Sequence, residues 1–307
     1  MSEHIPVLLQ EVLQMLNATQ GGVFIDATFG AGGYTCGILN AHSGNRVIAF
    51  DRDPSTKVTA CELSDKFQNR FSFVHDCFGQ MVNYVDTPVD GIVLDLGVSS
   101  MQIDHPDRGF SFRFDGPLDM RMGQNGICAK DVINNFDEGK IADILYRYGE
   151  ERASYRIARA IVTARRERPI ETTGSLADII HKVMPRPSDG SDSAMRSFQA
   201  LRIFVNDELG ELNMALNASI KLLKPGGRLV VVSFHSLEDR IVKTFMVNHS
   251  MKGGHVNKYL PDVEKAQGLF RILTKKPIVP GKDELERNSR AHSSKMRVAE
   301  RTAVVSS

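Results

Sequence analysis

The sequence predicts an α/β protein with a mostly parallel sheet and a helical insertion. Short apolar runs alternate with polar, helix-like stretches over residues 1–105, which is typical of strands joined by crossover helices. The alternation gives way to helical periodicity after Ser100 and returns near Lys224. A glycine-rich turn follows the first apolar run, as in folds that hold a nucleotide at the start of a helix.

Four apolar runs and the stretches between them support the first part of this prediction. We expect strands at Val23–Asp26, Val47–Phe50, Phe71–His75 and Gly91–Leu96. The segments Tyr34–Ala41 and Ser55–Phe67 are long enough to form crossover helices. Because such crossovers join parallel strands, these elements predict a doubly wound sheet with helices on both faces.

The middle of the chain shows helical spacing and no convincing buried strand. Apolar residues recur at i, i+3 and i+4 within 142–146 and 157–162, and the run 187–193 reads as a flexible loop. The strand pattern returns at 229–233 after a Pro-Gly-Gly turn. We therefore predict an α/β domain at residues 1–105 and 212–307 and an inserted helical domain at 106–211.

The totals exclude several classes of protein. A chain of 307 residues with a formal net charge of +1 can hold a large core, but any basic surface must be local. The four cysteines form no C-x-x-C pair, so we expect neither a metal site nor disulfides. Without a secretion-like signal or an apolar stretch of roughly 18 residues, we expect a soluble cytoplasmic protein with no membrane contact. The sequence indicates no obligate protein partner and leaves the oligomeric state open.

The glycine-rich turn and two acidic residues predict a site for a nucleoside-containing cofactor. The turn contains Gly30, Gly32 and Gly33. Their missing Cβ atoms let the backbone approach a ligand, and Asp51 ends the second strand, where a carboxylate can accept both ribose hydroxyls. Thr35 replaces the final glycine of a dinucleotide loop, and Asp26 suits a cationic cofactor but would repel a pyrophosphate. The structural alternative is a tight turn with Asp51 as a helix cap.

Nine segments spread along the chain carry a family resemblance. They lie at 4–11, 26–33, 49–54, 95–100, 108–112, 115–122, 148–152, 233–240 and 293–301. The most specific are Gly-Pro-Leu-Asp-Met-Arg-Met, at 116–122, and Ser-Phe-His-Ser-Leu-Glu-Asp-Arg, at 233–240. In this order they resemble the bacterial methyltransferases that modify cytosine N4 in small-subunit ribosomal RNA, and the resemblance extends from end to end.

This resemblance implies a class I methyltransferase sheet of seven strands, with S-adenosylmethionine as the cofactor. It implies methyl transfer to N4 of a cytosine in the decoding region of 16S rRNA, within an assembled 30S subunit. It also implies cofactor contacts at Gly32, Gly33, Tyr34, Asp51, Phe78, Asp95 and Gln102. Tyr34 replaces the histidine usual at its position, so we expect its backbone contact and leave the role of its side chain open.

The reaction predicts an acidic group at the end of the fourth strand. The lone pair on cytosine N4 is delocalised into the ring, so methyl transfer needs positioning and an acceptor for an amino proton. We expect Asp95 to be central, aided by Ser99 and Ser100 or by His235. The alternative for His235 is a hydrogen-bonded structural histidine, with Asp239 in the first turn of the next helix.

Aromatic and basic residues of the insertion predict contact with RNA. The candidates are Phe110, Phe112, Arg113, Arg121, Arg152, Arg156 and Arg159. The phenylalanines, with Phe114 continuing their alternation, either stack on an extruded base or belong to the core. The last three arginines, at i, i+4 and i+7, either contact phosphates or form a solvated helix face. Basic residues at 275–301 suggest a second phosphate-contacting segment.

Three rival functions stay open at this point. A methyltransferase of the same fold that acts on a small molecule or a protein predicts activity without RNA. A non-catalytic RNA-binding or ribosome-assembly factor predicts RNA binding without turnover, and the intact glycine turn, Asp51 and Asp95 count against it. A nucleotide-dependent oxidoreductase ranks last, because the turn lacks the final glycine of its loop.

Overall fold

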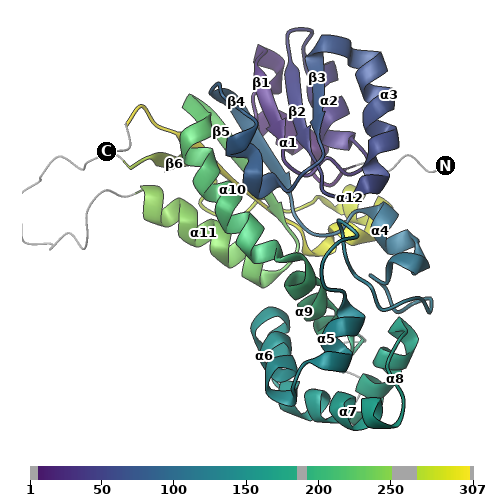
Figure 1. Ribbon diagram of the computed structural model, residues 1–307. Helices are drawn as coiled ribbons and strands as arrows, with labels where there is room; N and C mark the ends of the chain where they lie inside the picture. Colours follow the sequence, from purple (N-terminus) through teal and green to yellow (C-terminus); the bar gives the residue numbers. More distant parts are fainter. Residues whose placement is uncertain (1–5, 185–191, 251–267, 305–307) are drawn as a thin grey trace, which may run out of the picture. The chain divides into compact units, whose positions relative to one another are not determined.

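The computed structural model describes residues 6–184, 192–250 and 268–304, which form two compact units (Figure 1). One unit combines Met1–Gly97 with Gly210–Ser307, and the other is Val98–Leu209. Residues 98–105 therefore cluster with the helical unit, whereas the sequence pattern places them with the α/β domain. The loop expected at 187–193 falls largely outside the described residues.

The α/β unit contains a seven-stranded sheet in the order β3-β2-β1-β4-β5-β7-β6. Its strands are β1 (Val23–Asp26), β2 (Arg46–Phe50), β3 (Phe71–Val74), β4 (Val89–Asp95), β5 (Leu223–Ser233), β6 (Phe270–Ile272) and β7 (Lys295–Arg301). The first five strands are parallel, and β7 is antiparallel to both β5 and β6. The predicted mostly parallel, seven-stranded α/β fold is confirmed.

The expectation of a basic, phosphate-contacting segment near the C-terminal end of the sequence is wrong for two of its arginines. Arg297 and Arg301 lie on β7 and are only 8% and 7% exposed. Arg297 donates two hydrogen bonds to the carboxylate of Asp239, at 2.6 and 3.1 Å. Arg301 donates to four backbone carbonyl groups. Both side chains thus satisfy buried partners, because an unpaired buried guanidinium would be costly.

Helices cover both faces of the sheet. They are α1 (Leu9–Met15), α2 (Gly33–Ala41), α3 (Lys57–Phe67), α10 (Glu208–Leu222), α11 (Ser236–Ser250) and α12 (Lys282–Arg287), with short 3₁₀ turns η1 (Ala18–Gln20), η2 (Pro54–Thr56), η3 (Gln68–Arg70), η4 (Phe78–Asn83) and η6 (Ser289–Ser293). No helix in the described parts of the chain is long and apolar enough to cross a membrane.

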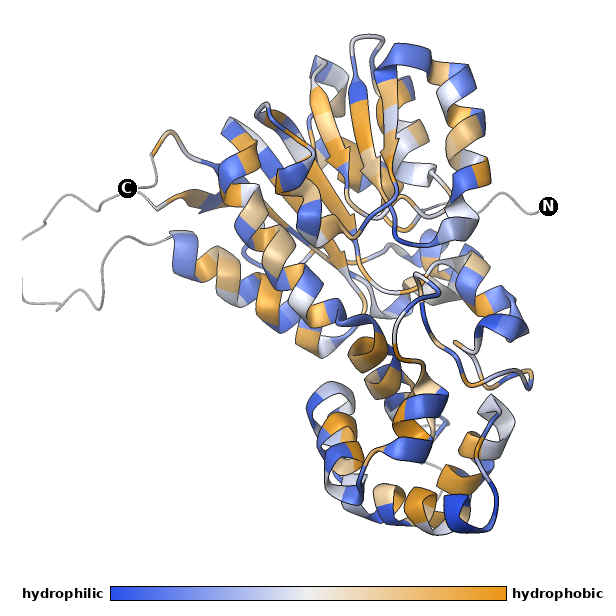
Figure 2. Ribbon diagram, in the orientation of Figure 1, coloured by the Kyte–Doolittle hydropathy of each residue, from blue (hydrophilic) through white to orange (hydrophobic). Residues whose placement is uncertain are grey.

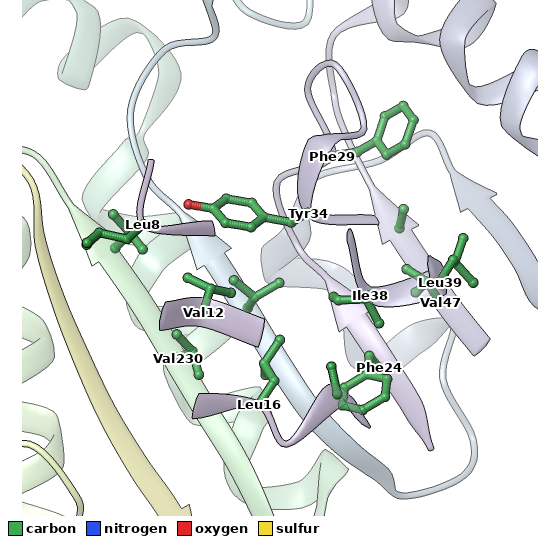
Figure 3. Close-up of a cluster of buried hydrophobic side chains, with 14 of the residues drawn as sticks. Leu8, Val12, Leu16, Phe24, Phe29, Tyr34, Ile38, Leu39, Val47 and Val230 are labelled. Carbon is green, nitrogen blue, oxygen red and sulfur yellow. The ribbon is translucent and has the colours of Figure 1, made fainter. Parts of the chain in front are cut away.

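Alternating side chains of β5 pack into two separate apolar cores, one on each face of the sheet. Val230 and Val232 pack into the core that contains α1, α2 and α3, part of which Figure 3 shows. Leu229 and Val231 pack into the core that contains α10 and α11. Both faces of the central strands are therefore apolar, as their colouring in Figure 2 shows, because consecutive residues of a strand point to opposite faces.

The second unit is helical. It contains α4 (Ser100–Asp104), the 3₁₀ turn η5 (Pro106–Arg108), α5 (Ala129–Asn135), α6 (Glu138–Gly149), α7 (Ser154–Glu167), α8 (Thr173–Val183) and α9 (Met195–Asn206). Its core is formed by apolar residues at helical spacing, among them Ile141, Leu145, Ile157 and Ile161, all fully buried. Among its described residues we find no strand, as the sequence predicts.

Hydrogen bonds fix the irregular segment that carries the Gly-Pro-Leu-Asp-Met-Arg-Met motif. The amide side chain of Asn206 accepts from the backbone N–H of Met122 at 2.8 Å and donates to the carbonyl of Met120 at 2.7 Å. Gly109 has a φ of 73°, and a Cβ there would lie 2.2 Å from the carbonyl oxygen of Pro117. The motif therefore has a clear structural role within the helical unit.

Candidate functional site

The expected site lies where parallel strands of the α/β unit end. Asp26 is the last residue of β1, Asp95 is the last residue of β4, and Asp51 directly follows β2. These three strands are neighbours and run in the same direction, so the three carboxylates lie at one edge of the sheet. Ligands of open α/β sheets bind at this edge.

Asp51 holds the glycine-rich turn in place. Its Oδ2 accepts a hydrogen bond from the N–H of Gly30, and its Oδ1 accepts one from the N–H of Asp53, both at 2.8 Å. Burial raises the pKa of Asp51 to about 6, although these two amide donors oppose the shift. Each carboxylate oxygen has a second lone pair, so Asp51 combines the expected structural role with a capacity to accept ribose hydroxyls.

Glycine is required in the turn for steric reasons. Gly30 and Gly32 have φ angles of 53° and 78°, in the left-handed region, and Gly32 directly precedes α2. A Cβ on Gly32 would lie 2.8 Å from Leu63 Cδ1, and one on Gly33 would lie 2.2 Å from Pro6 Cγ. The turn thus places backbone without Cβ atoms at the start of a helix, which lets a bound nucleoside approach the backbone closely.

Asp26 is completely buried beneath this turn. It accepts a hydrogen bond from the hydroxyl of Thr35 at 2.7 Å and one from the N–H of Thr28 at 3.3 Å. Burial raises its pKa to about 6, against the opposing effect of these donors. Thr35, which stands where a dinucleotide loop has its last glycine, is therefore the side chain that fixes Asp26.

Asp95 is the least satisfied acidic group of the three. Its backbone N–H donates to the hydroxyl of Thr28 at 2.7 Å, but its Oδ1 is enclosed and has no hydrogen-bond partner. Burial, together with the charges of Asp26 and Glu238, raises its pKa well above the usual range. A buried carboxylate oxygen of this kind is costly, so it indicates a ligand that brings a donor or a positive charge.

These residues fit S-adenosylmethionine and do not fit a dinucleotide. After burial, the causes that raise the pKa of Asp95 are other carboxylates, so this edge of the sheet is rich in acidic groups. A pyrophosphate would be repelled there, whereas an amino group and a sulfonium would be attracted. The glycine turn and Asp51 supply the contacts that the adenosine part requires.

The side chain of Tyr34 belongs to the core. It is 3% exposed, and its hydroxyl donates to the backbone carbonyl of Val7 (Figure 3). Burial, followed by the charges of Asp95 and Asp26, raises its pKa well above the usual range, so the phenol stays neutral. Tyr34 thus anchors the segment that precedes α1, and only its backbone is left for a cofactor contact.

His235 is held by a residue that the sequence analysis did not single out. Its Nδ1 accepts from the backbone N–H of Glu238 at 3.4 Å, and Oε2 of Glu238 accepts from the N–H groups of Phe234 and His235 at 2.8 and 3.2 Å. His235 Nε2 lies 3.0 Å from Glu238 Oε1, although the angles do not make this contact a hydrogen bond. The structural alternative therefore describes His235 well, as a reciprocal cap of α11.

A sequence signal for Glu238 existed. An acidic residue three positions after a polar residue, directly behind a strand, is typical of a capping box. The carboxylate of Asp239 instead accepts two hydrogen bonds from Arg297.

The predicted cofactor residues Phe78 and Gln102 and the predicted catalytic residues Ser99 and Ser100 have clear local roles. Phe78 begins η4 and packs against the core beneath α10. Ser99, Ser100 and Gln102 lie in the helical unit. The Ser99 hydroxyl accepts from the Gln102 N–H at 3.3 Å, and the Gln102 side chain accepts from the Ser99 N–H at 3.0 Å, which forms a capping box for α4. Ser100 is the first residue of that helix.

The predicted RNA contacts divide into packed and exposed residues. Phe110 and Phe112 pack against the helical core, and the ring of Phe112 lies 4.7 Å from that of Phe198. This placement favours the core interpretation. Arg121 donates to Asp119 at 2.6 Å, which favours pairing. Arg113 is exposed.

The basic face of the insertion differs from its prediction at one position. Arg152 lies in the turn before α7, so the three arginines do not share one helix. Arg156 and Arg159 are on α7 and exposed. Arg156 contacts Met184 Sδ at 2.8 Å, and Arg159 lies 3.6 Å from Glu138 with 80% of its side chain exposed.

Comparison with known proteins supplies the family. A family model described as "MraW methylase family" matches residues 1–302. "Ribosomal RNA small subunit methyltransferase H" of Afipia carboxidovorans is 53% identical over 307 residues, which is 98% of this chain and 91% of that protein. The protein of the same name from Bradyrhizobium diazoefficiens is 51% identical over 305 residues, 98% of this chain and 92% of that protein. The chain belongs to the MraW methylase family and is a methyltransferase.

Proposed function

We propose that this chain transfers a methyl group from S-adenosylmethionine to the exocyclic N4 of a cytosine in the decoding region of 16S rRNA. Relatives at 51–53% identity are named as methyltransferases of small-subunit ribosomal RNA. The observation that carries the chemistry is the enclosed, unpartnered Oδ1 of Asp95 at the end of β4. An acceptor in that place suits an amino group that must lose a proton.

The α/β unit supplies the contacts that hold the cofactor. S-adenosylmethionine, when bound, supplies a methyl group on a cationic sulfur. Asp51 accepts the ribose hydroxyls, and the turn at Gly30–Gly33 offers bare backbone to the ligand. The positive charges of the cofactor in turn favour the ionised forms of Asp26 and Asp95, which burial disfavours in the ligand-free protein.

Asp95 also serves the substrate. The N4 lone pair of cytosine reacts only when it is turned out of conjugation, so an acceptor that orients one amino proton contributes to positioning. Its raised pKa makes Asp95 a stronger base than an ordinary aspartate, which favours removal of that proton as the new bond forms. His235, closely engaged by Glu238, supports the turn beside this group.

We assign RNA recognition to the helical unit. Its exposed arginines, Arg113, Arg152, Arg156 and Arg159, offer contacts to phosphates. Such a local basic surface is compatible with a net charge of only +1 for the whole chain. Phe110, Phe112 and Arg121 support this unit from within. An assembled 30S subunit in the cytoplasm is the proposed substrate, since the relatives' names refer to the small subunit.

The test measures transfer of labelled methyl from S-adenosylmethionine to 30S subunits, naked 16S rRNA and total protein, followed by nucleoside analysis. We expect N4-methylcytidine on the 30S subunit. Label on protein or on a small molecule would favour the first rival function. RNA binding without any label would favour an assembly factor.

A further inference from the structure

The exposed side of α7 is basic. The segment 152–166, which covers the turn before α7 and most of the helix, contains five arginines and no acidic residue. Arg165 donates to the carbonyl of Ile133 at 2.6 Å and so supports the unit from within. The exposed ones are Arg152, Arg156, Arg159 and Arg166. A face of this composition attracts the phosphates of a nucleic acid.

An exposed aromatic ring stands among these arginines. Tyr155 lies in the first turn of α7 and is 69% exposed. Ile157, Ala158 and Ile161 bury the other side of the helix in the core of the unit. Since residues four apart share one side of a helix, Tyr155 and Arg159 point outward together.

A second exposed ring lies close by in the chain. Tyr146, in the last turn of α6, is 62% exposed, and a short connection at residues 150–153 leads from α6 to α7 (Figure 1). A single exposed tyrosine is ordinary on a protein surface. Aromatic rings interleaved with arginines are instead typical of surfaces that hold a nucleic acid strand.

The acidic side chains recorded beside this face belong to α6. Asp143 is paired with Arg147 at 2.7 Å. Glu138 lies 3.6 Å from Arg159, whose side chain nevertheless stays 80% exposed. The exposed side of α7 therefore keeps an excess of positive charge around the ring of Tyr155.

We propose that Tyr155 stacks on an unpaired base of the RNA substrate while the arginines around it contact the phosphates of the same strand. This inference rests on the proposed function and adds the kind of RNA that the helical unit holds. In a duplex both faces of each base are covered by its neighbours, and only an unpaired base offers a free face to an aromatic side chain. The α7 surface therefore selects a loop or another single-stranded segment.

The test measures binding of the full chain to a short labelled RNA strand of mixed sequence, alone and paired with its complement, at one fixed salt concentration. Tyr155→Leu keeps an apolar side chain of similar size but removes the ring. We expect it to weaken binding of the unpaired strand about tenfold and binding of the duplex less than twofold.

Two further variants make the result specific. Tyr155→Phe keeps the ring and should bind both RNAs within about twofold of the wild type. Arg159→Ala removes a charge and should weaken binding of both RNAs by a similar factor, because both contain phosphates. Thermal unfolding of each variant reports whether it is folded.

The outcomes separate this inference from the proposed function. Equal weakening of both RNAs by Tyr155→Leu would mean that Tyr155 only holds the arginines in place, and the inference would fail. Unchanged binding of the unpaired strand, or an equal loss in Tyr155→Phe, would overturn it as well. Methyl transfer to 30S subunits is measured separately on the wild type, so a failure of the proposed reaction is recognised independently of the binding result.

Discussion

Two aspartates, one in each unit, both stand in segments that carry the family resemblance but have opposite surroundings. Asp95 of the α/β unit has an enclosed oxygen without a partner, and burial and neighbouring acids raise its pKa. Asp119 of the helical unit accepts three hydrogen bonds from the Arg121 side chain, at 2.6 to 3.2 Å. Partial burial raises the pKa of Asp119, but hydrogen bonds from Arg121 outweigh it and lower the pKa overall.

This difference distinguishes a functional motif from a structural one. An unsatisfied buried carboxylate lowers the free energy of unfolding, so its presence indicates a site where a bound ligand supplies the missing partner. A satisfied charge such as Asp119 holds its own segment together. We therefore expect a substitution of Asp95 to change the rate of methyl transfer and a substitution of Asp119 to change stability.

The largest effect should come from Asp95→Asn. The amide cannot accept the amino proton, so we expect the single-turnover rate of methyl transfer to fall about 10³-fold. Asp119→Asn is the matched control and should reduce stability while leaving this rate within about threefold. Full turnover by Asp95→Asn, with unchanged cofactor affinity, would remove Asp95 from the chemistry.

Substitutions of two members of the phenylalanine alternation, Phe112 and Phe114, should differ in their effect on stability. Phe112 packs edge-on against Phe198, so Phe112→Ala should lower the free energy of unfolding by about 3 kcal/mol. Phe114 is 68% exposed, and Phe114→Ala should change it by less than about 0.5 kcal/mol. Urea denaturation measures both values. If Phe112→Ala lost RNA binding but no stability, base stacking would be the correct interpretation.

The buried acids should make the ligand-free protein less stable as the pH rises from 4 to 7. The folded pKa of Asp26, about 6, exceeds the ordinary 3.8, so folding takes up a proton within this window. The resulting stability is present below the ordinary pKa and lost as the pH rises through about 6, at up to about 3 kcal/mol. Asp51, also near 6, acts in the same direction.

Asp26→Asn tests this pH dependence. The variant cannot titrate at this position, so denaturation between pH 4.5 and 7.5 should show a shallower slope than in the wild type. An identical slope would mean that Asp26 has an ordinary pKa in the folded protein.

The smallest effect should come from an exposed arginine. Arg159→Ala should weaken RNA binding about threefold and reduce the slope of log affinity against log salt by about 1. Arg121→Ala is the control, because Arg121 is paired with Asp119 and should leave the slope unchanged. Equal slopes for Arg159→Ala and the wild type would exclude phosphate contact at α7.

Periodicity and turn chemistry were enough to predict most of the sheet. β1 was predicted at its observed bounds, and β2, β3 and β4 within two residues, because buried parallel strands are continuous apolar runs between polar crossovers. β6 and β7 were missed. β7 has the sequence Lys-Met-Arg-Val-Ala-Glu-Arg, in which four of seven residues are charged, so it does not have the pattern of a buried strand. Its arginines find their buried partners only in the folded structure.

The site was predictable where it depends on sequence order and not where it depends on hydrogen bonds. Asp26, Asp51 and Asp95 follow strands, so their common edge could be inferred. The capping-box spacing of Glu238 was also visible in the sequence, but its reciprocal contact with His235 depends on the geometry at the start of α11. The core roles of Tyr34 and Phe112 likewise required their packing partners.

The position of β7 in the sheet imposes an order on assembly. β6 pairs with β7 and has no other strand neighbour in the described sheet, and β7 occupies the place between β6 and β5. During synthesis β5 and β6 both emerge before the strand that joins them. The edge of β5 therefore has unpaired backbone N–H and C=O groups until residues 295–301 are synthesised. A chain that is halted before that point exposes an edge strand that can pair with other chains and aggregate.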